Sequence, residues 1–209
     1  MNLKYKYIVW DWNGTLLDDI SASLASVNDM LIKRNMDIID IVRYKECIGV
    51  PIICFYEQVF DLEKEEYEDL LREYNEGYNK HLKNCTLADG ARELLEKFRS
   101  DNAIQLIVSS ANNVILKENI EKFGVSEYFD AALGSDNFFA ESKIQRAVDY
   151  INKKGKGDIL VIGDLAHDYE MAQELSADCI LTKTGHENPK VLAKCDCKIV
   201  ENLREIINN

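Results

Sequence analysis

The sequence predicts an α/β protein with a doubly wound, Rossmann-like parallel sheet core and an inserted all-helical cap domain. Short apolar runs such as residues 7–10 and 158–162 have the length and composition of buried strands. From Thr86 onward these runs alternate with helical segments, which indicates a parallel sheet covered on both faces. Residues 18–85 show only helical spacing of apolar side chains. Right-handed crossovers then give a doubly wound arrangement.

The same patterns divide the chain into two parts. We expect residues 1–17 and 86–209 to form the core, and residues 18–85 to form the cap. Helices are predicted in the cap over residues 20–34, 41–49, 52–60 and 63–82, with Asp18, Asp19 and Ser21 as candidate caps of the first. In the core, the pattern predicts strands at 7–10, 103–108, 129–133, 158–162, 179–181 and 198–200, and helices at 89–100, 113–123, 142–154 and 167–176.

Composition narrows the class of protein. The formal net charge of −12 over 209 residues disfavours nucleic-acid and anionic membrane surfaces as partners. No apolar run approaches the roughly 20 residues that span a bilayer, and the N-terminal residues lack the apolar region of a secretory signal. We therefore expect a cytoplasmic monomer or homodimer that binds neither nucleic acid nor membrane.

Polar side chains follow several predicted strands at the point where each strand ends. Because the C-terminal ends of parallel strands lie along one edge of a sheet, these side chains can converge. Taken singly, each has an ordinary interpretation as a turn, a helix cap or a solvated charge. The groups are Asp11 with Asn13, Ser109 with Ser110, Lys143 in the segment 141–143, and Asp164 with Asp168.

Together these groups suit phosphoryl transfer. Carboxylates from two strands make an oxygen site of the kind that Mg²⁺ prefers. Asp11 would attack phosphorus and form an aspartyl-phosphate. The metal ion and Lys143 would neutralise the charge on the transferring group.

At this point the chain resembles the haloacid dehalogenase superfamily, in its phosphoglycolate phosphatase-like branch with a small helical cap. The segment from Asp11 to Thr15 resembles the first motif of that family, whose leading aspartate is the nucleophile. Ser109, after Val108, resembles the second-motif hydroxyl that binds the phosphoryl group. Lys143 falls at the third-motif lysine, without the proline that often follows, and the segment from Gly163 to Asp168 resembles the metal-binding fourth motif.

The resemblance implies roles for individual residues. Mg²⁺ would be held by the Asp11 carboxylate, the Asn13 backbone carbonyl and Asp164, with Asp168 acting directly or through water. The expected catalytic residues are Asp11, Asn13, Ser109 and Lys143. The expected substrate-binding residues are Gly14, Thr15, Ser110 and Arg43.

Asn13 departs from the family pattern. Typical phosphatases of this family have aspartate there, which protonates the leaving group and then activates water. An amide does neither, and such acid–base catalysis contributes about 10²–10⁴-fold. A slow Mg²⁺-dependent phosphatase acting on small phosphorylated metabolites remains the leading hypothesis, with a preference for good leaving groups.

Three alternatives stay open. A phosphonatase would need a cap lysine just after a Gly-x-Pro turn, but Gly49-Val50-Pro51 is followed by Ile52. A dehalogenase would need no metal, whereas both aspartates of the metal motif are present. A regulatory protein could keep the Mg²⁺ and phosphate pocket with little turnover, and Asn13 is the feature that favours it.

The sequence indicates the substrate less specifically than it indicates the type of reaction. Resemblance to phosphoglycolate phosphatases suggests that compound, although fold-level analogy does not settle substrates. Arg34, Arg43 and Lys45 are the cap's candidate anion-binding groups, with ordinary solvated side chains as the alternative. His167 could line the pocket or face solvent.

Overall fold

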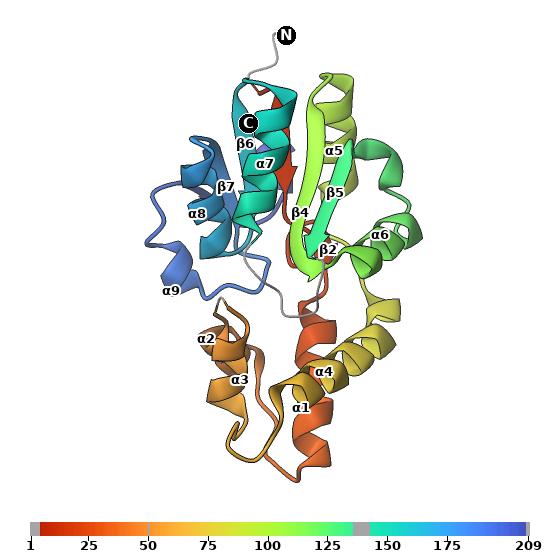
Figure 1. Ribbon diagram of the computed structural model, residues 1–209, viewed down its shortest axis with the longest axis vertical. Coiled ribbons are helices and arrows are strands. Elements are labelled where there is room, and N and C mark those ends of the chain that lie inside the picture. The colour runs from red at the N-terminus through yellow and green to blue at the C-terminus, as the bar shows by residue number, and fades with distance from the viewer. Residues whose placement is uncertain (1–4, 50, 136–142, 208–209) are drawn as a thin grey trace.

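The computed structural model describes residues 5–49, 51–135 and 143–207. Its centre is a six-stranded sheet in the order β5-β4-β1-β6-β7-β8, and every neighbouring pair is parallel. The predicted doubly wound α/β core is therefore confirmed (Figure 1). The strands are β1 (Tyr7–Trp10), β4 (Ile104–Asn112), β5 (Ala131–Ser135), β6 (Ile159–Gly163), β7 (Asp178–Thr182) and β8 (Lys198–Val200).

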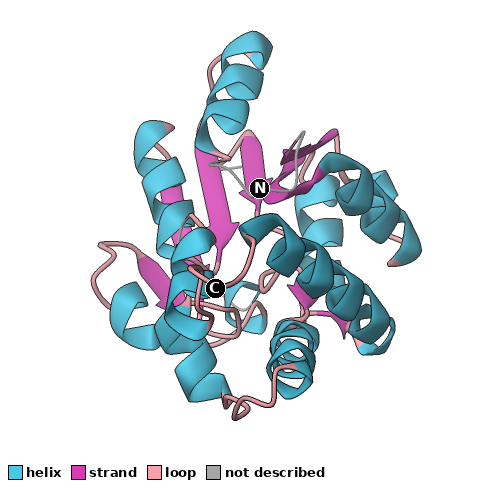
Figure 2. Ribbon diagram, turned by 60° about the horizontal axis from the view of Figure 1, so that its bottom comes forward, coloured by secondary structure: helices cyan, strands magenta, loops and turns pink. Residues whose placement is uncertain are grey.

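Strand β1 lies in the middle of the sheet, and its four side chains are fully buried. Because side chains alternate along a strand, Tyr7 and Val9 enter one hydrophobic cluster while Ile8 and Trp10 enter another. Helices α7 (Ile144–Lys154), α8 (Ala166–Glu174) and α9 (Pro189–Leu192) cover the first face. Helices α5 (Ala91–Ser100), α6 (Asn113–Lys122) and α10 (Arg204–Ile207) cover the second (Figure 2).

The helical segment after β1 forms a separate body below the C-terminal ends of the strands (Figure 1). It contains α1 (Ile20–Lys33), α2 (Ile41–Cys47), α3 (Ile53–Val59) and α4 (Tyr67–His81), and a short 3₁₀ turn, η1 (Leu82–Asn84), follows. Most of its buried apolar residues make a hydrophobic cluster of their own, while Ala22, Tyr78 and Leu82 belong to a cluster around the sheet. The chain enters and leaves this body through a small antiparallel ribbon, β2 (Leu17–Asp18) paired with β3 (Thr86–Leu87).

Several boundaries differ from those expected. Strand β4 continues to Asn112 through an irregularity in its pairing after Val108, so Ser109 and Ser110 lie within a strand and not in a loop. Helix α4 begins at Tyr67 rather than at residue 63. A second 3₁₀ turn, η2 (Ser126–Tyr128), precedes β5, which starts at residue 131 rather than 129. Val50 and residues 136–142, which include the expected start of a helix at 142, lie outside the described residues.

Within the described ranges, no helix combines the length and the apolar character needed to cross a bilayer.

Candidate active site

Asp11 is the first residue after β1, at the C-terminal end of the central strand. Its backbone N–H donates to the carbonyl oxygen of Ile162 at 2.9 Å, which continues the β1–β6 pairing by one residue. The chain then turns sharply, and Gly14 adopts a positive φ of +74°. A Cβ at that glycine would lie 2.5 Å from both the Asp164 carboxylate and the His186 ring, so only glycine fits there.

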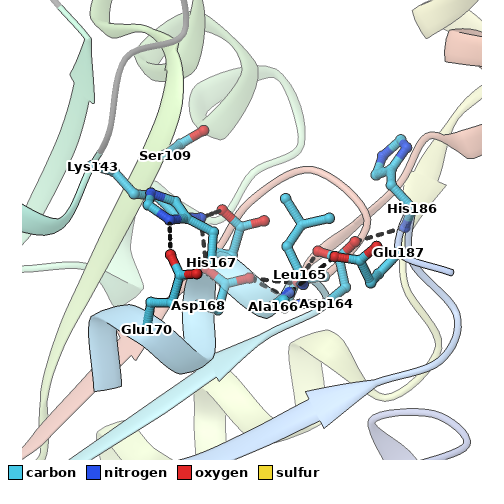
Figure 3. Close-up of polar contacts among 12 residues, drawn as sticks. Ser109, Lys143, Asp164, Leu165, Ala166, His167, Asp168, Glu170, His186 and Glu187 are labelled. Carbon is cyan, nitrogen blue, oxygen red and sulfur yellow. Dashed lines mark hydrogen bonds and ion pairs between the residues drawn. The ribbon is translucent and has the colours of Figure 1, made fainter. Parts of the chain in front are cut away.

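Lys143 lies against Asp11 although 132 residues separate them in the sequence. Its ammonium group forms ion pairs with Asp11 and, at 2.7 Å, with Oδ1 of Asp168 (Figure 3). All three side chains are buried. Burial lowers the pKa of Lys143, but attraction to the two carboxylates outweighs it and raises that pKa above its ordinary value. The lysine therefore stays charged inside the protein.

The carboxylates of Asp11, Asp164 and Asp168 form a cluster whose oxygens lie within 4.8 Å of one another. Burial raises the pKa of Asp164 to about 6, with Asp168 adding to the shift. Burial also raises the pKa of Asp11, assisted by the charges of Asp168 and Asp164. Three buried carboxylates face one lysine, so the donor set and its surplus negative charge fit a hard divalent cation such as Mg²⁺.

Local hydrogen bonds hold Asp164 and Asp168 in place. Asp168, in the first turn of α8, accepts at Oδ2 from the backbone N–H groups of Asp164 (3.1 Å) and Leu165 (3.0 Å). Asp164 accepts at Oδ1 from the Thr15 hydroxyl (2.8 Å) and at Oδ2 from the His186 backbone N–H (2.6 Å). Thr15 thus orients a carboxylate of the cluster, and it does not line the cavity described below.

Ser109 and Ser110 lie in β4, which neighbours β1, and contribute polar groups to the site. Ser109 is 3% exposed, and its hydroxyl accepts from the Ala111 backbone N–H at 3.1 Å. Arg146 donates to the Ser109 backbone carbonyl at 2.9 Å, which fixes this end of β4 against α7. Both serines line the same cavity as Asp11 and Lys143.

Asn13 is engaged by two neighbours through its amide nitrogen. Nδ2 donates to Oδ2 of Asp19 at 2.7 Å and to the Tyr78 hydroxyl at 2.9 Å. Tyr78 in turn donates to the same carboxylate oxygen of Asp19 at 2.7 Å. The amide thus links the strand tip to the first residues of the cap and to α4.

Asp19 and His186 complete this network, and the sequence interpretation missed both roles. Oδ1 of Asp19 accepts from the Gly14 backbone N–H at 2.7 Å and lies 3.1 Å from Nε2 of His186. Nδ1 of His186 lies 3.0 Å from the Tyr44 hydroxyl of α2. His186 and these hydrogen bonds hold the pKa of Asp19 below its ordinary value despite its burial. Burial lowers the pKa of His186, but attraction to Asp19 outweighs it and raises that pKa to about 9.

Local sequence gives little indication of these roles for Asp19 and His186. Asp19 is predicted to be a helix cap, and it does occupy the N-cap position of α1. Its side chain makes no capping hydrogen bond there and instead accepts from the Gly14 backbone N–H. His186 lies in a loop after β7 and carries no motif around it. Only the fold brings position 186 next to position 19.

A cavity of about 240 Å³ lies between the strand ends and the cap. The core contributes Asp11, Asn13, Ser109, Ser110, Lys143 and His186 to its wall, and the cap contributes mainly tyrosines and aliphatic side chains. Small-molecule sites have this mixed character, a mostly apolar wall with a few convergent polar groups.

The expected anion-binding groups of the cap do not reach this cavity. Arg43 lies beside Glu46 and donates weakly to the Gln58 carbonyl at 3.5 Å. Arg34 is paired with Glu65 and Glu73 inside the cap. His167 is buried and pairs with Glu170 at 2.8 Å (Figure 3), and it is not among the residues that line the cavity.

Known proteins resemble this chain in sequence. The family model described as haloacid dehalogenase-like hydrolase matches residues 8–182. A phosphoglycolate phosphatase from Pseudomonas fluorescens is 20% identical, covering 97% of this chain and 78% of the relative. A 5'-nucleotidase from Pseudomonas aeruginosa is 26% identical, covering 85% and 82% respectively.

Solved structures show the same fold. A haloacid dehalogenase-like hydrolase from Streptococcus pneumoniae superposes with a TM-score of 0.82 at 17% identity, covering 98% of both chains. A hydrolase from Pseudomonas syringae gives a TM-score of 0.77 at 18% identity, covering 98% of this chain and 97% of the other. The sheet order, the strand-tip aspartates and the matched family model agree, and the chain belongs to the haloacid dehalogenase-like hydrolases.

Proposed function

We propose that this chain is a Mg²⁺-dependent phosphatase that hydrolyses small phosphate monoesters through an aspartyl-phosphate on Asp11. The observation that carries the proposal is the position of the Asp11 carboxylate. It lies at the wall of a ligand-sized cavity, next to a buried lysine and two further aspartates. Each of these groups favours binding of a phosphoryl group at that point.

In the first step, a carboxylate oxygen of Asp11 attacks phosphorus and the bond between phosphorus and the alcohol oxygen breaks. Lys143 holds a positive charge beside the phosphoryl oxygens. The hydroxyl of Ser109, which lines the same cavity, donates to one of those oxygens. In the second step, water attacks phosphorus, releases inorganic phosphate and restores the Asp11 carboxylate.

The oxygens of Asp11, Asp164 and Asp168 and the Asn13 backbone carbonyl would hold Mg²⁺. When bound, the cation supplies charge neutralisation to the phosphoryl group. It would also lower the raised pKa values of Asp11 and Asp164, because a nearby positive charge favours the ionised carboxylate.

Asn13 determines how the leaving group obtains its proton. Its amide cannot release one, so the alcohol oxygen departs with a proton taken from solvent. Asp19 does not replace the missing acid, because its carboxylate already accepts four hydrogen bonds and its pKa is lowered. Turnover is therefore slow for poor leaving groups.

A second candidate function has one specific observation in its favour. The amide of Asn13 is bound by Asp19 and Tyr78 and makes a fixed link between core and cap. Such a link suits a protein that binds phosphate and Mg²⁺ to report on them rather than to turn over substrate. The presence of Asp11, Ser109 and Lys143 together favours the phosphatase.

Release of inorganic phosphate from a panel of esters, with and without Mg²⁺, tests the proposal. The panel contains phosphoglycolate and nucleoside 5'-monophosphates, because relatives carry those activities in their names, and p-nitrophenyl phosphate as a good leaving group. We expect turnover only with Mg²⁺ and fastest with p-nitrophenyl phosphate. Binding of inorganic phosphate without turnover of any ester would favour the second candidate.

A further inference from the structure

The cap side of the cavity has few charged groups. Among the described residues that line it, Lys143 and His186 are the only basic ones. Lys143 is already paired with Asp11 and Asp168, and His186 with Asp19. Lys45 lies outside the lining, with its ammonium group 3.5 Å from the Lys183 carbonyl oxygen.

Four tyrosines line the remaining wall, and the hydroxyl groups of three of them are used within the protein. The Tyr44 hydroxyl contacts His186 at 3.0 Å, that of Tyr74 donates to Ser23 at 3.1 Å, and that of Tyr78 donates to Asp19. The rings of Tyr74 and Tyr78 stack with centroids 5.9 Å apart, and Tyr56 contacts Tyr74 edge to face. What these residues leave for a ligand is largely ring surface.

Apart from Ser23 and the Asp19 carboxylate, the other cap residues in the wall are apolar or carry uncharged amides, and residues of β4 and α6 continue this surface. Aliphatic side chains of the cap and of α6 add to the apolar part of the wall, and asparagines supply the polar part. The aliphatic residues are Ile48, Ile52, Leu71 and Ile115, and the asparagines are Asn75, Asn79, Asn112 and Asn119. Such a surface can bind a flat apolar group and hydrogen-bond its edge.

A second negative charge on the substrate would meet a different environment. Beyond the phosphoryl group it would face tyrosine rings and the Asp19 carboxylate, without a free cation among the described lining residues. A carboxylate that loses water without gaining a partner is strongly disfavoured. Phosphoglycolate carries such a carboxylate.

We infer that this phosphatase selects phosphate monoesters whose alcohol portion is uncharged and aromatic or otherwise apolar, and that it discriminates against phosphoglycolate. The selection follows from the tyrosine-lined cap side of the cavity, which offers no cation among the described residues. This inference rests on the proposed phosphatase function and adds the class of its substrate.

Matched esters test the inference without changing the chemistry of bond cleavage. Benzyl phosphate, 4-carboxybenzyl phosphate, ethyl phosphate and phosphoglycolate all release primary alcohols. We expect kcat/KM for benzyl phosphate to exceed that for phosphoglycolate by roughly 100-fold, because the carboxylate would lie unpaired in the cavity. The 4-carboxyl group should depress kcat/KM relative to benzyl phosphate, and ethyl phosphate should rank between benzyl phosphate and phosphoglycolate.

A variant that adds a cation to the wall provides the complementary test. Asn79 is an exposed residue of α4 that lines the cavity and takes no part in the catalytic cluster. Asn79→Arg should narrow the ratio of kcat/KM between benzyl phosphate and phosphoglycolate by about tenfold. Glu76→Gln is the control, because it makes the same change of +1 in net charge on the same helix outside the cavity and should leave the ratio unchanged.

The outcomes separate this inference from the proposed function. A kcat/KM for phosphoglycolate equal to or above that for benzyl phosphate would overturn the inference while leaving the phosphatase proposal intact. An equal change of the ratio in Asn79→Arg and Glu76→Gln would also overturn it. Absence of phosphate release from every ester would refute both the inference and the proposed phosphatase function.

Discussion

The two sides of the cavity are built in different ways. On the core side, Asp11, Lys143, Asp164 and Asp168 are all buried. Backbone N–H groups donate to the carboxylates of Asp164 and Asp168, and Lys143 pairs with Asp11 and Asp168. On the cap side, tyrosines and asparagines supply most of the wall, and the described residues there include no cation. The core side therefore suits a charged phosphoryl group, while the cap side suits an apolar alcohol portion.

The two sides meet at one network. Asn13 and Gly14 from the core, Asp19 at the start of the cap, Tyr78 of α4 and His186 of the core are joined by hydrogen bonds. Substitutions at the core-side strand ends, including Asn13, should change the rate of chemistry, and loss of His186 from the network should lower the stability of the protein. Four experiments test this division.

Loss of the nucleophile should have the largest effect. In Asp11→Asn the amide cannot attack phosphorus, so we expect turnover of p-nitrophenyl phosphate to fall by about 10⁴-fold or more. The control is Asp18→Asn, which alters an exposed carboxylate of the ribbon and should retain full activity. Activity of wild-type size in Asp11→Asn would refute the assignment of the nucleophile.

Loss of the positive charge of Lys143 should have the second-largest effect on activity. In Lys143→Met, the carboxylates of Asp11 and Asp168 lose their ion pairs with the lysine, and the phosphoryl group loses a positive charge. We expect kcat to fall by about 10²–10³-fold and the melting temperature to fall as well, with partial recovery in Mg²⁺. Lys153→Met, an exposed residue of the same helix, is the matched control for both measurements.

Restoring a carboxyl at position 13 should raise the rate. In Asn13→Asp, the new side chain would lie beside the Asp19 carboxylate, whose Oδ2 is now 2.7 Å from Nδ2 of Asn13. That like charge raises the pKa of the new carboxyl and keeps it protonated, as a general acid requires.

We therefore expect kcat for an alkyl phosphate to rise by about 10²-fold, and by less for p-nitrophenyl phosphate. Asn13→Ala serves as the comparison, since it removes the amide without adding an acid. If Asn13→Asp folds and is no faster than wild type, the missing acid does not limit the reaction.

The smallest effect concerns stability and its dependence on pH. The pKa of His186 is raised to about 9 in the folded protein, against 6.5 for an ordinary histidine. Its ion pair with Asp19 therefore stabilises the fold fully below about pH 6.5. That contribution is lost as pH rises through about 9.

His186→Asn should lower the free energy of unfolding at pH 6 by about 1–3 kcal/mol, measured by urea unfolding. The difference between wild type and variant should shrink between pH 7 and pH 10. A difference that stays constant over that range would show that packing, and not the ion pair, carries the contribution of His186. The exposed pair of His81 with Asp29 offers a control, since removing it should cost far less.

The sequence alone determined the sheet core and most positions of the proposed catalytic cluster. Buried strands give apolar runs, and strand ends in a parallel sheet share one edge, so Asp11, Ser109, Lys143 and Asp164 could be brought together from local patterns. The helical spacing of residues 20–82 likewise indicated the helices of the cap. These signals are local, because they depend on periodicity and on residues close to a strand end.

Only the tertiary structure decided which groups face the ligand on the cap side. Arg43 seemed a reasonable anion-binding residue from its charge, yet it lies beside Glu46 and Gln58 outside the cavity. His186 and Asp19 lie 167 residues apart, and neither shows its role in local sequence. The packing of the cap helices against the strand ends sets these contacts, and packing between distant segments leaves no periodic signal in the chain.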